Sequence, residues 1–190
     1  MIDSFRNIFA IPDLRRRVLF TFSLLAVYRL GAFIPIPGVN PVALAELTQQ
    51  AQGTVLGFLN LFSGGALGRM TVFALGIMPY ISASIILQLL TVVWPYLEKL
   101  SKEGELGRRK ITQYTRYGTV VLSVIQSMGI AFFLENQEQP NVVPDALEGW
   151  GFRLLTVLTL TTGTAFVMWL GEQISERGIG HGIPLIILPG

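Results

Sequence analysis

The stretch FSGGALGRMTVFALGIMPYISASIILQLL, residues 62–90, joins a glycine-rich apolar segment directly to a long apolar helix candidate. No charged residue occurs between Arg69 and Glu98, a run of 28 residues. At about 1.5 Å of rise per residue, a helix of this length crosses the roughly 30 Å hydrocarbon core of a bilayer. The preceding segment, 62–67, is too short to span and rich in glycine, which suits irregular backbone. Such backbone is tolerated at membrane depth only where protein or a water-filled cavity shields it, so the pattern predicts a re-entrant segment beside a spanning helix.

The composition of the whole chain is that of an integral membrane protein. Of its 190 residues, 51% are hydrophobic and 14% are charged, and the mean hydropathy is +0.56. Charged residues make up about 25% of a typical soluble domain. The net charge of +2 comes from short basic clusters between apolar runs, which is typical of topology signals and does not indicate nucleic-acid binding. The chain has no cysteine, which excludes disulfides and cysteine-based metal sites.

The succession of apolar runs predicts an all-α integral membrane protein with four transmembrane helices, the start of a fifth, and the short re-entrant segment. Prolines and polar glycine-rich stretches separate the runs, because proline cannot continue the hydrogen-bond ladder of a helix. A short helix is expected near 41–50. The expected order is an amphipathic segment at 1–17, span 1 at 18–37, a loop at 38–60, the re-entrant segment at 61–70, span 2 at 71–94, a loop at 95–116, span 3 at 117–134, a loop at 135–150, span 4 at 151–172, a turn at 173–182 and the start of span 5 at 183–190.

The basic residues predict the orientation of these spans. Residues 1–17 and 98–116 hold ten of the fourteen Lys and Arg, whereas 135–149 holds none. By the positive-inside rule, the N-terminus, the 95–116 loop and the 173–182 turn are cytosolic, and the other two loops are external. The chain stops inside its fifth apolar run, so we expect a fragment of a longer protein that is not active alone.

Three isoleucines, Ile77, Ile81 and Ile85, lie at i, i+4 and i+8 and share one face of the second span. Such a stripe either packs on neighbouring helices or lines a pore, where aliphatic side chains block ions by dewetting, and periodicity does not separate the two. Pro79 falls inside the predicted span and is expected to kink it. Gln88 is polar within the span and requires a partner.

The sequence offers no catalytic or metal site. His181 is the only histidine, and no cluster of acids accompanies it. The glycines at 178–182 lack the preceding strand and the GK[ST] that a phosphate loop requires. Arg29 is the one charge inside the first apolar run, and we expect its long side chain to reach outward to water. We therefore expect no enzyme activity and no cofactor.

Four stretches closely resemble the SecY family: FIPIPG at 33–38, LFSGGALGR at 61–69, FALGIMPYISASIILQLL at 73–90 and SERGIG at 175–180. The family provides the channel subunit of the bacterial Sec protein translocon, with ten spans in two inverted halves. The resemblance covers nearly the whole chain and implies that it is the N-terminal half of such a channel. The sequence reads GIGHGIP at 178–184, where the family usually has GIGNGIS.

The resemblance also implies roles for three groups of residues. One group forms a hydrophobic pore ring, a second forms a plug that closes the pore from outside, and a third contacts signal sequences at a lateral gate. The ring residues are Ile77, Ile81 and Ile187; the plug residues are Phe62, Ser63, Gly64, Gly65, Ala66 and Leu67; the gate residues are Ile85, Gln88 and Leu89.

The implied activity is passive conduction. Unfolded secretory polypeptides would cross the cell inner membrane, and membrane proteins would enter it sideways, with hydrolysis left to a partner. The expected partners are the small membrane subunits SecE and SecG, the SecA motor ATPase, the ribosome with its nascent chain, signal sequences and membrane lipids. Nucleic-acid contact is expected only through the ribosome.

Two other classes of protein fit parts of the pattern. A secondary transporter would use the broken helix, with its small and polar residues at mid-depth, as a substrate site. Coupled transporters commonly carry buried acids or bases in their spans, and only Arg29 qualifies here. A membrane assembly scaffold without a pore would not need a glycine-rich segment before span 2.

The predicted orientation can be tested with single cysteines, since the native chain has none. In the full-length protein, Ser101→Cys should be protected from an impermeant thiol reagent added outside, and Asn141→Cys should react. The positive-inside rule is the physical reason. The opposite labelling pattern would reverse the topology.

Overall fold

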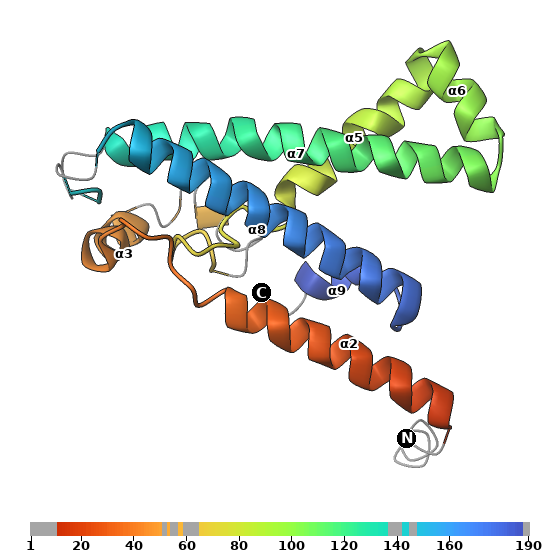
Figure 1. The fold of residues 1–190 in the computed structure, drawn as a ribbon, viewed down its shortest axis with the longest axis horizontal. Coiled ribbons are helices and arrows are strands. Elements are labelled where there is room, and N and C mark those ends of the chain that lie inside the picture. Colours follow the sequence, from red (N-terminus) through yellow and green to blue (C-terminus); the bar gives the residue numbers. More distant parts are fainter. Residues whose placement is uncertain are drawn as a thin grey trace.

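The computed structural model describes residues 11–50, 53, 57–58, 65–136, 142–144 and 148–187. Over these residues the fold is all-helical, with one isolated antiparallel β-bridge between Pro35 and Thr71. Figure 1 shows the arrangement of the helices. They are α2 (Pro12–Gly31), α3 (Pro41–Gln50), α5 (Met78–Val93), α6 (Pro95–Lys102), α7 (Glu105–Glu135), α8 (Trp150–Arg177) and α9 (Gly182–Ile187).

Helices α7 and α8 are the longest and pack against each other in opposite directions (Figure 1). The buried face of α7 repeats a small residue every fourth position, which permits close approach of neighbouring helices. Its hydroxyls donate to carbonyls within α7 itself: Thr119 to Thr115 at 2.7 Å and Ser127 to Ser123 at 2.6 Å. The face therefore needs no polar partner from another helix. Its members are Thr115, Thr119, Ser123, Ser127 and Ala131.

Among the described helices, α7 and α8 are long and apolar enough to cross a membrane, and the bent pair α5–α6 adds a third candidate if it forms one span. Helix α2 is not among them. Its first turns carry Asp13 and three arginines, and the apolar part from Val18 to Gly31 reaches only about 20 Å at 1.5 Å per residue. The count of four spans stays a prediction.

The helix ends lie toward two opposite ends of the molecule. The start of α2, the α6–α7 turn and the α8–α9 turn lie toward one end of the molecule, on the right in Figure 1. Helix α3, the end of α7 and the start of α8 lie toward the other end. The short helix expected near 41–50 is confirmed, since α3 spans Pro41–Gln50. Which end faces the cytosol stays a prediction.

Helix α5 begins later than the sequence predicted. The predicted span started at residue 71, whereas regular helix starts at Met78. Gly76 has φ +53°, which breaks a right-handed helix, and residues 65–77 form successive turns instead. Pro79 then lies in the first turn of α5, where its missing N–H would be unpaired anyway. The expected kink at Pro79 is therefore wrong.

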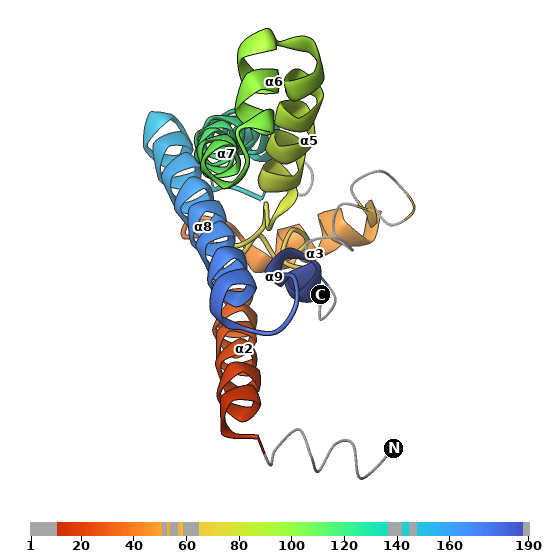
Figure 2. The same ribbon diagram turned by 90° about the vertical axis from the view of Figure 1, so that its right-hand side faces the viewer.

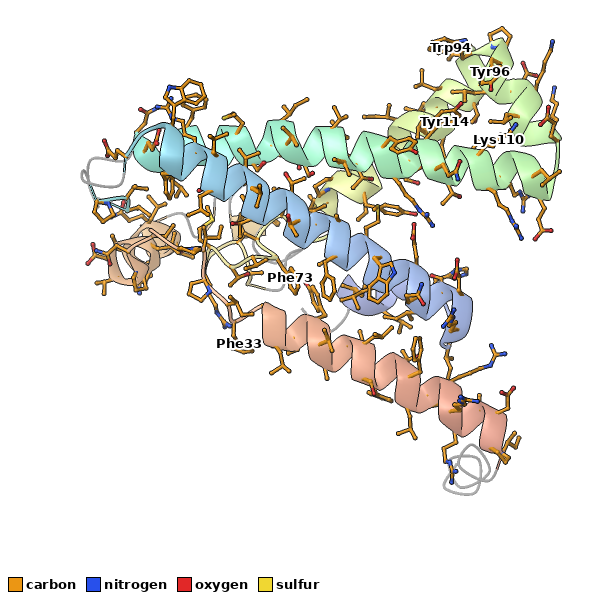
Figure 3. The ribbon with its side chains drawn as sticks, viewed as in Figure 1. Phe33, Phe73, Trp94, Tyr96, Lys110 and Tyr114 are labelled. Carbon is orange, nitrogen blue, oxygen red and sulfur yellow. The ribbon has the colours of Figure 1, made fainter. Side chains whose placement is uncertain are left out.

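The segment predicted as a cytosolic loop, 95–116, is almost entirely helical. Helix α5 ends at Val93, and α6 leaves it at an angle of 99°. Pro95 explains this corner, because it cannot donate to the preceding turn and it starts α6. Trp94 and Tyr96 lie at the corner, and Tyr114 lies on the facing part of α7 (Figure 3). Seen from the direction of Figure 2, helices α5, α6 and α7 lie together on the side of the molecule opposite α2.

Two clusters of buried apolar residues hold the fold together. The first, toward the α3 end, joins α3, residues 70–75, residues 142–143 and the facing ends of α7 and α8. The second joins α2, residues 73–77, the later half of α8 and α9, and its members are Tyr28, Phe73, Ile77, Val167, Leu170, Ile174 and Ile186. Residues 65–77 contribute to both clusters, so this non-helical segment is the centre of the packing.

A pair of variants tests the start of α5. Gly76→Ala should lower the free energy of unfolding by at least about 1 kcal/mol, because alanine is strained at positive φ. Pro79→Ala should change it by less than about 1 kcal/mol, because proline is well tolerated in a first turn. Thermal unfolding of the full-length protein in detergent measures both. A large stabilisation by Pro79→Ala, of about 3 kcal/mol, would instead mean that Pro79 interrupts a helix.

Candidate pore site

The backbone of residues 65–77 satisfies its polar groups by short-range turns. Amide-to-carbonyl bonds join residues three apart at Met70 to Leu67 (3.0 Å), Ala74 to Thr71 (2.9 Å) and Gly76 to Phe73 (2.8 Å). A non-helical segment inside a membrane protein requires such internal pairing, since hydrocarbon offers no partner. Turn hydrogen bonds therefore satisfy part of the backbone of this non-helical segment, and its predicted re-entrant placement in the membrane stays a prediction.

Neighbouring segments hold residues 68–72 of this segment in place by hydrogen bonds. The Ile36 N–H donates to the Met70 carbonyl at 2.9 Å, and the Val72 N–H donates to the Ile34 carbonyl at 3.0 Å. The Thr48 hydroxyl of α3 donates to the Gly68 carbonyl at 3.0 Å. The extended residues after α2 and helix α3 thus fix residues 68–72 by main-chain carbonyls and amides.

A stack of four aromatic rings crosses the molecule beside the element. Tyr28 of α2 stacks on Phe73 with a centroid separation of 5.6 Å, and Phe73 stacks on Phe166 of α8 at 5.9 Å. Phe166 continues to Trp169 at 5.8 Å. Such offset-stacked pairs each contribute about 0.5–1.5 kcal/mol beyond their buried area. Phe73 lies between α2 and α8 (Figure 3) and links both helices to the turn segment.

The predicted ring residues lie close to this stack. Ile77 is 4% exposed and belongs to the second cluster, together with Ile186 of α9. Ile81 is partly buried and packs against the same cluster. The side chain of Ile187 lies outside the described residues. The structure thus brings Ile77 and Ile81 into one apolar cluster with Ile186, near the end of α9. The sequence analysis did not single out Ile186, because its burial depends on the direction of α9.

The isoleucine stripe becomes exposed further along α5. Ile85 is 52% exposed and Leu89 is 64% exposed. Gln88 is exposed, and its amide contacts only its neighbour one turn back, the Ser84 hydroxyl at 3.4 Å. The predicted gate residues therefore form an apolar face with one amide, which the described chain leaves uncovered.

The predicted plug is only partly described. Phe62, Ser63 and Gly64 lie outside the described residues. Gly65 has φ +76°, Ala66 is 1% exposed, and Leu67 packs against the first cluster.

A family comparison assigns this arrangement to a known group of proteins. The sequence model of the SecY family matches residues 71–190. The chain belongs to the SecY family. It is 57% identical to the protein translocase subunit SecY of Escherichia coli (strain K12) over 94% of its own length and 40% of that protein. It is 48% identical to the SecY subunit of Aquifex aeolicus over 100% of its own length and 45% of that protein. The chain thus spans less than half the length of these relatives.

Solved structures show the same fold. Sec61 in the canine ribosome-channel complex from the endoplasmic reticulum superimposes with a TM-score of 0.60 at 18% identity, over 92% of this chain and 35% of that one. A structure described as a protein-conducting channel gives the same values. Membership of the SecY family, together with the apolar helices, places this chain in a membrane. The expected resemblance is confirmed, whereas the individual roles of the ring, plug and gate residues remain predictions.

Two ion pairs that the sequence analysis missed stabilise opposite ends of the α7–α8 pair. Arg116 contacts Glu172 at 2.7 Å, and Arg153 contacts Glu135 at 2.6 Å. Glu135 also accepts the Gly149 N–H at 3.1 Å. The partners are 56 and 18 residues apart in the sequence, so no local sequence motif predicts these ion pairs.

Beside Arg116, a cavity of about 640 Å³ opens between α7 and α8. It is lined by Arg109, Thr112, Gln113, Arg116 and Glu176.

The turn before α9 depends on two hydroxyls from other helices. The Thr21 hydroxyl of α2 accepts the Ile179 N–H at 3.1 Å, and the Ser175 hydroxyl accepts the Gly182 N–H at 2.9 Å. These bonds fix the position at which α9 starts, and with it Ile186. Among the described residues, no group of three or more His, Cys, Asp or Glu could hold a metal ion.

Removing the Thr21 acceptor should loosen this turn. Thr21→Val keeps the shape of the side chain but leaves the Ile179 N–H without its partner, which costs about 1 kcal/mol, or a roughly fivefold change in the opening equilibrium. Amide hydrogen exchange at 178–182 in the full-length protein should rise accordingly. Thr112→Val is the control, because that hydroxyl is exposed and donates only to the Arg108 carbonyl. Equal exchange in both variants would contradict this role of Thr21.

Proposed function

We propose that this chain forms the N-terminal half of the central subunit of a protein-conducting channel. The channel moves unfolded secretory polypeptides across the cell inner membrane and releases membrane proteins sideways into it. One observation carries the proposal: in a chain of the SecY family, the isoleucine stripe of α5 follows the non-helical segment 65–77 and runs from a buried to an uncovered position. The printed names of the relatives, protein translocase subunits, support the same activity.

The buried end of the stripe suits a constriction. Ile77, Ile81 and Ile187 form the ring, and Phe62 to Leu67 close it from outside. Aliphatic side chains offer no fixed charge for ions to bind, so a narrow apolar passage blocks ions by dewetting. The same side chains can part around many different residues of a passing chain and then close again. Such conduction is passive, and this chain performs no hydrolysis.

The uncovered end of the stripe suits recognition of signal sequences. Ile85 and Leu89 present an apolar face, and Gln88 adds one amide to it. An apolar helix can lie along such a face with anchors every third or fourth residue. When the channel is closed, the same face packs against the other half of the channel.

The partners follow from the family and from the charge distribution. The N-terminus and the α6–α7 turn face the cytosol, where they carry most of the basic residues. SecE, SecG, SecA and the ribosome with its nascent chain are the proposed partners, and the described fold matches a channel solved in complex with a ribosome. A secondary transporter would need charges at mid-depth. Among the described residues, the Arg116–Glu172 and Arg153–Glu135 pairs border the uncharged stretches 117–134 of α7 and 154–171 of α8.

The constriction is tested best at Ile81. Ile77 is buried in the second cluster, so truncating it removes packing worth about 2–5 kcal/mol and confuses leak with instability. Ile81 is only partly buried. In the full-length channel in liposomes, Ile81→Ser should raise the resting ion conductance severalfold, because a hydroxyl wets the barrier.

The matched control is Ile125→Ser on α7, where the isoleucine is 61% exposed and is not a member of the stripe. Translocation of a signal-bearing substrate by the same liposomes establishes that the channel is active. An unchanged conductance for Ile81→Ser, with substrate still translocated, would remove Ile81 from the ring. Failure of the wild-type channel to translocate any such substrate would overturn the proposed function.

A further inference from the structure

Gly163 and Gly31, which lie on α8 and α2, make room for residues 72 and 73 in the middle of the non-helical segment 65–77. A Cβ atom at Gly163 of α8 would lie 2.0 Å from the Val72 carbonyl oxygen and 2.9 Å from its carbon. A Cβ at Gly31 of α2 would lie 2.1 Å from Cε2 of Phe73. Real side chains do not approach so closely, so residues 72 and 73 occupy places that only glycine leaves open.

These contacts hold two consecutive residues from opposite sides. The Val72 N–H is bonded to Ile34, and its carbonyl rests against the bare backbone of α8 at Gly163. The Phe73 ring rests against Gly31 and is stacked between Tyr28 and Phe166. Neither residue can shift without moving a helix backbone or unstacking a ring.

The held pair lies four residues before the start of the constriction. Turn hydrogen bonds join Ala74 to Thr71 and Gly76 to Phe73, so the segment up to Ile77 follows residues 72 and 73 as one short unit. The position of Ile77 therefore depends on how deeply the unit rests between α2 and α8. That depth is set by the missing side chains at 31 and 163.

We infer that Gly163 and Gly31 are positioning residues for the constriction: they determine where Ile77 and the start of α5 are presented to the pore. The inference rests on the proposed function. Neither glycine belongs to the ring, the plug or the gate, and each acts through backbone or ring contacts with residues 72 and 73. A side chain at 163 would push the Val72 carbonyl away from α8 and displace Ile77 with it.

The first test is Gly163→Ala in the full-length channel in liposomes, with resting ion conductance measured per channel. We expect a severalfold rise, because the displaced Ile77 leaves the dewetted barrier incomplete. Gly129→Ala is the matched control: it makes the same change in a membrane helix, and nothing lies within 4 Å of the added Cβ. We expect no change in conductance for that variant.

A second measurement reports position directly. The chain has no cysteine, so Ile81→Cys, at a partly buried position in the first turn of α5, provides a single thiol whose rate of reaction with a water-soluble reagent reports its surroundings. Gly163→Ala should change this rate severalfold, and Gly129→Ala should leave it unchanged. If Gly163→Ala does not fold, Gly31→Ala replaces it in both measurements, because its clash is with the Phe73 ring and not with backbone.

The outcomes separate the inference from the function on which it rests. Lower thermal stability with unchanged conductance and unchanged thiol reactivity would mean that the glycines only pack the fold, and would overturn the inference. A leak from Ile81→Ser without one from either glycine variant would do the same while leaving the proposed function intact. No leak from Ile81→Ser in an active channel would count against the ring itself.

Discussion

A peptide group without a hydrogen-bond partner is costly to bury away from water, and residues 65–77 are where this chain meets that constraint. The segment is neither helix nor strand, yet it lies at the centre of both apolar clusters. Some of its backbone N–H and C=O groups are paired by turn hydrogen bonds inside the segment. Others are paired by two main-chain hydrogen bonds to residues 34 and 36 and by the Thr48 hydroxyl. The helices around it are arranged so that these partners lie within reach.

The sequence predicts the parts of this fold that are set locally. Apolar runs without charges identify α7 and α8, and Pro41 after a polar turn marks the start of α3. The helices within 95–116 are not predicted, because hydropathy identifies only apolar runs. This stretch is polar and basic, although its residues are good helix formers. The sequence predicts Pro79 at mid-span, because nothing in the hydropathy reveals the positive φ of Gly76 just before α5 starts at Met78.

The candidate site was predictable only as far as its residues share a helical face. Ile77, Ile81 and Ile85 do lie along the start of α5, but their burial differs from one to the next. That difference arises from α8 and α9, whose contacts with α5 join residues far apart along the chain. The contacts of Thr21, Glu172 and Arg153 are not predictable from the sequence for the same reason. Each joins residues on different helices, which come together only when the helices pack.

The close approach of Val72 to α8 shows which residues determine the position of the non-helical segment. The contact joins main chain to main chain, so the side chain at 72 has little influence on it, while one absent methyl group at 163 permits it. The position of segment 65–77 thus depends on a glycine in α8, about 90 residues further along the chain. The residue type at 163 therefore matters more to this contact than the identity of any residue within the contacted backbone, because an ordinary residue there would leave no room for the Val72 carbonyl.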